Sequence, residues 1–159
     1  MEKIKELELQ IRIMANIIDT QEKIIAELKR VLPQRVIFVG MFNKPNKQPL
    51  DSSTMTGKVI DRIIEKISAT CIKTNLCDID YFPKDKKIIL ACNLEWSKRH
   101  QPTSDTVIVL LGGWVQKNFL LTEAKIIKLT HPAGIFGTKN KDEYINGAVA
   151  QIKSVIIAK

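Results

Sequence analysis

Two polar side chains stand where an apolar run gives way to a loop, and both types suit hydrogen bonding at a reactive site. His131, in the segment KLTHPAGIFG, follows the apolar run at 125–130. A histidine can donate a hydrogen bond to developing negative charge or move a proton near neutral pH. Asn75, in KTNLCD, offers a donor and an acceptor side by side, which matches the edge of an amide-like ring such as a pyrimidine. The alternative for each is local: His131 closes a turn and Asn75 forms an Asx turn.

Motifs for several other chemistries are missing from the sequence. It contains no GxxxxGK[ST] phosphate-binding loop, no GxGxxG dinucleotide fingerprint and no GxSxG nucleophile elbow. Its three cysteines are an odd number and do not make a disulfide framework. The candidate chemistry therefore rests on the hydrogen-bonding side chains of the loops.

Apolar patterning from residue 35 onward alternates between strand-like runs and helical stripes. Runs such as RVIFVG and TVIVLLG predict buried strands, while GKVIDRIIEKISA has the spacing of an amphipathic helix. The expected strands are 35–40, 71–76, 106–112 and 125–130, and the expected helices are 57–69, 84–99, 113–121 and 141–158. Such alternation is typical of an α/β fold with three layers, α/β/α, around a four-stranded parallel sheet. Sites in such sheets lie beyond the carboxyl ends of the strands, which selects the loops 41–56, 75–84, 112–116 and 131–138.

The first 32 residues form a separate segment with a seven-residue apolar repeat. The a and d positions of this heptad are filled, apart from Gln21, by Ile4, Leu7, Ile11, Met14, Ile18, Ile25, Leu28 and Leu32. The residue before Pro33 is disfavoured in a helix, so the helix is expected to end there. The sequence thus predicts a long, coiled-coil-like helix over 1–32 and a domain over 33–159. The helix either pairs with a copy of itself, a dimer being the first expectation, or lies along the domain.

Charge is distributed unevenly between these two parts. Lys plus Arg number 25 against 17 Asp plus Glu, a formal charge of +8. Residues 1–32 hold equal numbers of acidic and basic residues, so the excess lies in 33–159. A basic domain favours a polyanionic partner, most often nucleic acid, although solubility alone is the alternative. No apolar run approaches the roughly 20 residues of a membrane span, and the charged N-terminus lacks a signal-peptide core. We therefore expect a cytoplasmic protein without a membrane partner.

Five segments, in order along the chain, resemble motifs of the uracil-DNA glycosylase superfamily. RVIFVGM with the Asn/Pro loop after it resembles the first motif, Gly-x-Asn-Pro or Gly-Gln-Asp-Pro. TGKVIDRII resembles the Gly-(Lys/Arg)-x-Leu-Leu-Asp helix, and KTNLCD resembles the second strand with its asparagine. VIVLLGGWVQKNF resembles the apolar third strand with its Gly-x-x-Ala/Val-Gln helix start, and KLTHPAGIFGTKN resembles the His-Pro-Ser motif. The resemblance covers residues 35–155 and leaves the N-terminal helix outside.

The resemblance implies a DNA glycosylase, which flips a base out of DNA into a pocket and breaks its N-glycosidic bond. Asn75 would read the pyrimidine edge, and His131 would stabilise charge on the base oxygen. The other base-binding residues implied by the first motif are Gly40, Met41 and Phe42.

The first motif departs from the family pattern at the residue that positions the attacking water. Relative to Gly-x-Asn-Pro, the segment 40–45 carries an extra residue between its glycine and its asparagine, and it contains no Asp or Glu. The resemblance gives this role to Asn43, which can orient a water but cannot accept its proton; turnover is therefore expected to be slow. The nearest carboxylate in this loop is Asp51. The four-cysteine cluster of some family branches needs a thiolate that this chain lacks, so neither metal nor cofactor is expected.

DNA contacts are expected from residues around the same loops. Lysines there would meet phosphates, and the two apolar residues after Gly134 match the place where the family inserts a wedge into the DNA stack. Those two residues pack under the loop in the alternative interpretation. The expected DNA-binding residues are Lys44, Gly113, Ile135, Phe136 and Lys139.

Two further hypotheses share this fold. A non-catalytic module would bind a nucleobase, a nucleotide or modified DNA, with the N-terminal helix supplying avidity. A nucleotide or nucleoside hydrolase would break the same bond in a small soluble substrate. DNA binding with a steep inverse salt dependence would favour the glycosylase over the hydrolase.

Overall fold

The computed structural model describes residues 1–31, 34–120, 122–135 and 140–157 of the 159-residue chain. It divides into two compact units, Met1–Pro33 and Gln34–Lys159. None of the described helices combines the length and the apolar character needed to cross a membrane.

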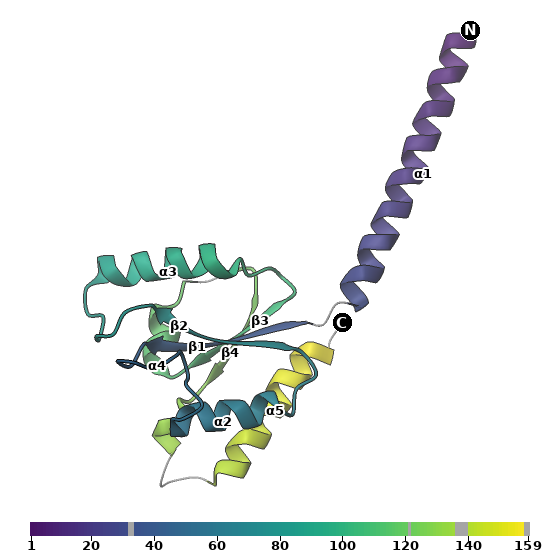
Figure 1. Cartoon of the computed structure of the whole chain (residues 1–159). Helices are drawn as coiled ribbons and strands as arrows, with labels where there is room; N and C mark the ends of the chain where they lie inside the picture. Colours follow the sequence, from purple (N-terminus) through teal and green to yellow (C-terminus); the bar gives the residue numbers. More distant parts are fainter. Residues whose placement is uncertain (32–33, 121, 136–139, 158–159) are drawn as a thin grey trace. The chain divides into compact units, whose positions relative to one another are not determined.

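The first unit is one helix, α1 (Glu2–Val31), drawn in purple in Figure 1. Its sequence contains neither Gly nor Pro, so nothing in it interrupts the backbone hydrogen bonds. Its large apolar residues from Ile4 to Leu28 are between 50% and 66% exposed. The heptad stripe is therefore uncovered along the helix.

The second unit is a parallel sheet between two layers of helices. Within the described residues the sheet has the order β2-β1-β3-β4, and every neighbouring pair is parallel. Its strands are β1 (Arg35–Phe42), β2 (Thr70–Cys77), β3 (Thr106–Leu111) and β4 (Lys125–Leu129). The helices are α2 (Met55–Ile64), α3 (Lys86–His100), α4 (Gly113–Asn118), the short 3₁₀ turn η1 (Pro132–Ile135) and α5 (Lys141–Ile157). This confirms the predicted α/β/α fold with its added N-terminal helix.

The central strands are buried on both faces, which explains why they read as continuous apolar runs. Val36 and Phe38 of β1 face the cluster that includes residues of α2 and α5. Ile37 and Val39 point to the other face, where they join Trp96 of α3 and residues of α4. Figure 1 shows α3 on one side of the sheet and α2 with α5 on the other.

The helix α3 is held partly by a buried polar residue that periodicity did not predict. Asn93 is 3% exposed, and its side-chain amide donates to the carbonyls of Ile89 and Asn118 at 3.0 and 2.9 Å. Its carbonyl accepts from the backbone of Leu120 at 2.9 Å. Since all these groups are paired, the buried amide carries no large desolvation penalty. It fastens α3 to the end of α4.

Candidate functional site

His131 lies directly after β4, at the edge of the sheet where the strands end. The backbone N–H of Ala133 donates to Nδ1 of His131 at 3.2 Å, so Nδ1 is an acceptor and the proton of the neutral ring sits on Nε2. Burial, together with the positive charge of Lys44, holds the pKa of His131 below its ordinary value. The imidazole is therefore a neutral hydrogen-bond donor at neutral pH.

Residues of α4, of α5 and of the turn before α4 fix the position of this histidine. Gly112 adopts φ +90°, and a Cβ there would lie 3.0 Å from Cβ of His131, so the position requires glycine for both conformation and space. The side chain of Gln116 in α4 donates to the carbonyl of Leu129 at 2.8 Å, which ties α4 to the end of β4. Tyr144 of α5 donates to the carbonyl of Thr130 at 2.6 Å. The loop that carries His131 is thus anchored on both sides.

Asn75 occupies the corresponding place in β2 and is 7% exposed. It pairs in register with Gly40 of β1, and a Cβ on Gly40 would come within van der Waals overlap of Oδ1 of Asn75. The glycine therefore leaves room for the carboxamide to lie across β1. Nδ2 of Asn75 donates to Oδ1 of Asn43 at 2.8 Å. The nitrogen of the Asn75 carboxamide therefore faces Asn43.

Asn43 continues this arrangement toward the surface. Its backbone N–H donates to the carbonyl of Ile79 at 2.8 Å, and its Nδ2 donates to Oδ1 of Asp78 at 2.6 Å. Asp78 also lies 3.5 Å from a guanidinium nitrogen of Arg99. The chain Asp78–Asn43–Asn75 therefore orients both carboxamides, and one lone pair on Oδ1 of Asn43 remains for a further donor.

A cavity of about 200 Å³ lies between these loops. This volume is below the roughly 300–1,000 Å³ of pockets for drug-sized ligands, so it suits a single ring. Residues predicted for base binding or catalysis meet here, whereas Asn43 itself is not part of the lining. The predicted residues that line the cavity are Gly40, Met41, Phe42, Lys44, Asn75 and His131.

The loop after β1 completes the wall of the cavity with Leu50, Asp51 and Thr54. Thr54 caps α2, since its Oγ1 accepts from the backbone of Gly57 at 3.0 Å. A Cβ on Gly57 would overlap the backbone carbonyl of Asp51, so only glycine lets the loop pack on this first helical turn. Hydrogen bonds, first from the Ser53 side chain and then from its backbone, hold the pKa of the Asp51 carboxyl below its ordinary value. Asp51 is the carboxylate of the cavity lining, and it is ionised at neutral pH.

The residues predicted to contact DNA are placed differently from one another. Lys44 is exposed at the cavity, and Gly113 is exposed with no atom within 4 Å of an added Cβ. Ile135 is only 4% exposed and packs under its loop; in this conformation it is not a projecting wedge. Phe136 and Lys139 lie outside the described residues.

None of the three cysteines lines the cavity, although Cys77 is the register partner of Phe42. Cys77 is buried, and burial together with the neighbouring Cys92 raises its pKa to about 12. A thiol with so high a pKa is a poor nucleophile at neutral pH. Among the described residues, no three His, Cys, Asp or Glu side chains gather as they would around a metal ion.

Comparison of the chain with protein-family models and with curated proteins finds no match. The function of the candidate site is therefore inferred from its own residues, a neutral imidazole donor and an oriented carboxamide that line one small cavity.

Proposed function

We propose that residues 34–159 bind a pyrimidine base flipped out of DNA and hydrolyse its N-glycosidic bond. The observation that carries the proposal is that Asn75 and His131, from the ends of β2 and β4, line the same single-ring cavity. The carboxamide supplies a donor and an acceptor for the base edge. The imidazole supplies a donor for the oxygen that becomes negative as the bond breaks.

The reaction needs one water and no cofactor. The water oxygen bonds to C1′ of the sugar while the electron pair of the C1′–N bond leaves with the base. The Nε2–H of His131 stabilises the anionic base, and the proton lost by the water passes to solvent, from which the base is protonated. Asn43 orients the water through its remaining lone pair. It takes no proton, so the proposed reaction is slow.

The charge of the domain supports a DNA substrate. The excess of +8 lies outside the neutral N-terminal segment, and Lys44 stands at the cavity. Cations around a base-binding pocket meet the phosphates of the flipped nucleotide and its neighbours. We expect the affinity for DNA to fall steeply with salt, as it does when phosphate contacts release counterions.

The first motif favours a second candidate, a non-catalytic module for a nucleobase or modified DNA. Asn43 stands where a carboxylate would take the proton of the water, and both ends of its carboxamide are held by Asn75 and Asp78. Such a protein would bind the base through the same cavity and release the DNA intact.

A single-turnover assay with excess protein separates these two functions. The substrates are single- and double-stranded oligonucleotides that contain uracil, mismatched uracil or thymine, or hydroxymethylated or glucosylated pyrimidines, and alkali-labile abasic sites are measured. Asn75→Leu is expected to lower the excision rate by about 5- to 150-fold, because the base edge loses its paired contact.

Thr74→Val is the matched control for Asn75→Leu, because Thr74 is the neighbouring buried polar residue of β2 and its hydroxyl contacts His100 instead of the cavity. Binding without abasic sites on any substrate would favour the module. Equal rates for wild type and Asn75→Leu would contradict the role given to Asn75.

We also propose that α1 joins two or more copies of the chain. The stripe of a and d residues, with Ile at its a positions and mainly Leu or Met at d, is the pattern that favours two-stranded coiled coils. Its residues are half or more exposed. Burying them against the same stripe of another copy removes this surface from water.

Replacing Ile18 by Asp is expected to dissociate the assembly, because a charge would be buried in the seam. Sedimentation equilibrium should show the dissociation constant rising at least about 100-fold. Leu9→Asp is the matched control, since Leu9 is 58% exposed but lies outside the a and d positions. A wild-type chain that is monomeric at every concentration would overturn the proposal.

A further inference from the structure

Three aromatic rings form a row beside the cavity. The ring centroids of Phe42 and Phe82 are 6.0 Å apart with an interplanar angle of 84°, and those of Phe82 and Trp114 are 6.0 Å apart at 63°. Each ring comes from a different part of the chain: Phe42 is the last residue of β1, Phe82 lies between β2 and α3, and Trp114 is in the first turn of α4. We call Phe42, Phe82 and Trp114 the aromatic row.

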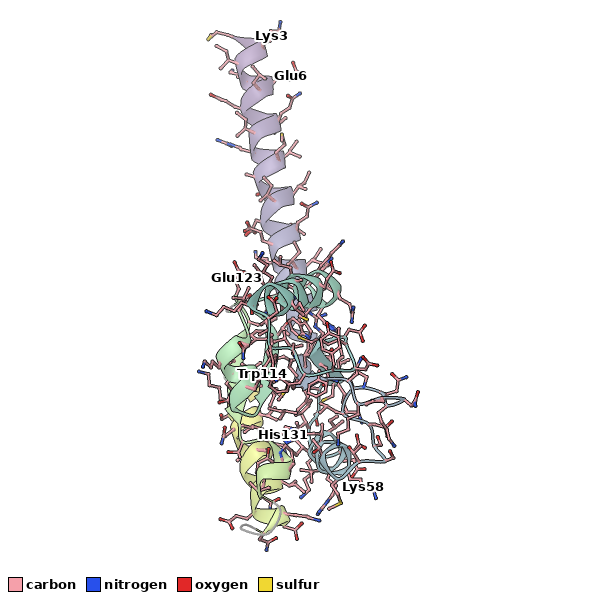
Figure 2. The ribbon with its side chains drawn as sticks, turned by 90° about the vertical axis from the view of Figure 1, so that its left-hand side faces the viewer. Lys3, Glu6, Lys58, Trp114, Glu123 and His131 are labelled. Atoms are coloured by element: carbon pink, nitrogen blue, oxygen red, sulfur yellow. The ribbon has the colours of Figure 1, made fainter. Side chains whose placement is uncertain are left out.

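The row starts at the cavity and continues onto the surface. Phe42 lines the cavity, whereas Phe82 is 45% exposed and Tyr81 beside it is 52% exposed. At the far end, Trp114 lies two residues after Gly112, where an added Cβ would lie 3.0 Å from Cβ of His131. Figure 2 looks onto this edge of the sheet and shows Trp114 and His131 on the same side of the domain.

Packing of the core does not account for the exposed part of the row. Phe42 and Trp114 are partly buried against the core on the α3 side of the sheet, but Phe82 belongs to neither core cluster. Its ring contacts only the other two members of the row among the ring pairs of the described residues. Because Phe82 contacts Phe42 of the cavity lining, its exposed surface and that of Tyr81 extend the apolar wall outward, and a contiguous exposed apolar patch marks a surface for a ligand.

Exposed lysines stand on the same segments as the rings, and the Phe82 segment also carries the exposed carboxylates Asp78, Asp80 and Asp85. Lys44 follows Phe42, three lysines follow Phe82, and one lysine stands on α4. These lysines are Lys44, Lys84, Lys86, Lys87 and Lys117. Stacking rings interleaved with cations are the features by which proteins bind unpaired nucleic acid, since the rings hold bases and the cations follow the backbone.

We infer that the aromatic row stacks on unpaired bases next to the base in the cavity, and that the substrate is therefore single-stranded DNA. This inference rests on the proposed function, which gives the cavity its base. In a duplex the neighbouring bases are stacked and paired, so their faces are not free for Phe82 or Trp114. An unpaired strand presents these faces at no such cost.

The test compares the affinities of single-stranded and duplex oligonucleotides of the same sequence, by fluorescence anisotropy at fixed salt. The variants are Phe82→Ala, Trp114→Ala and Phe82→Leu, of which Phe82→Leu keeps apolar contact but removes the ring. Each is expected to weaken single-strand binding by about 5- to 150-fold and to change duplex binding less. Leu94→Ala, at a residue of α3 that is 60% exposed, is the control and should change neither.

A second readout uses the intrinsic fluorescence of tryptophan. The chain has two tryptophans, and Trp96 is 2% exposed, so quenching by an added strand reports on Trp114. The inference predicts quenching by single strands that is lost in Trp114→Phe, while that variant still binds. Equal affinity of wild type for single strands and duplex, or variants that weaken both alike, would overturn it.

Binding and abasic-site formation, measured together, distinguish failure of the proposed reaction from failure of the stacking surface. If the wild type binds single strands through the row but forms no abasic site on any substrate, the reaction is refuted and the stacking surface stands. If it forms abasic sites and the aromatic variants bind and react as the wild type does, the stacking surface is refuted and the reaction stands.

Discussion

Exchanging the residues of the Asn43–Asp78 pair, in the double variant Asn43→Asp with Asp78→Asn, is expected to raise the single-turnover rate of excision by about 10²- to 10⁴-fold. That range is the usual contribution of a positioned general base. The exchange reverses the 2.6 Å hydrogen bond between the two side chains without losing it, and Asn75 still donates to an oxygen of residue 43. The new carboxylate can take the proton that Asn43 cannot.

The single variants are the controls for this exchange. Asn43→Asp alone places two carboxylates at hydrogen-bond distance, which raises the pKa of one of them, so its rate gain should appear only as the pH increases. Asp78→Asn alone should leave the rate near that of the wild type, because its contact with Arg99 is exposed and contributes little. A double variant no faster than the wild type would show that the water does not lie at Asn43.

Replacing His131 by Ala is expected to lower the excision rate by about 10²- to 10³-fold, the usual effect of removing one donor from a developing oxyanion. Binding of the oligonucleotide should change far less, because the donor matters most when the base carries charge. His100→Gln is the control, since His100 contacts Thr74 and Trp96 and does not line the cavity. Equal losses of binding and rate would contradict this role.

The pH dependence follows from the protonation state of the same ring. Burial first and Lys44 second hold the pKa of His131 below its ordinary value near 6.5, so the ring stays neutral as the pH falls through 6.5. Below the lowered pKa, Nδ1 is protonated and can no longer accept from Ala133. This histidine's contribution to stability should therefore be constant above pH 6.5 and fall at lower pH. Titration of the two histidines by NMR measures this directly.

The sequence indicates more of the fold than of the contacts within the site. Alternating patterns from residue 35 onward predict the four strands and the four α-helices of the domain, because the strands are buried on both faces and the helices carry apolar stripes. The 3₁₀ turn η1 is not predicted, and α2 ends at Ile64, five residues before the end expected for it. The rule that parallel sheets bind ligands beyond their strand ends brings Asn75 and His131 to one edge. Both side chains line the cavity there.

What the sequence could not indicate are contacts between loops that lie far apart in the chain. Asp78 holds Asn43 across 35 residues, and neither loop carries a pattern that predicts the other. Phe82 lies outside every periodic segment, so its place between Phe42 and Trp114 appears only in the structure. For Ile135 the sequence indicates a role that the structure does not show. Its position after His131 fits a wedge, but the residue is buried in the 3₁₀ turn η1.

The decisive measurement for base excision is the release of free base from a labelled oligonucleotide under excess wild-type protein. Chromatography of the products separates the free base from the intact strand, across the modified and unmodified pyrimidines in single-stranded form. We expect one free base for each abasic site, formed slowly by the wild type and much more slowly by His131→Ala. An oligonucleotide that is bound in full and recovered without loss of any base would contradict it.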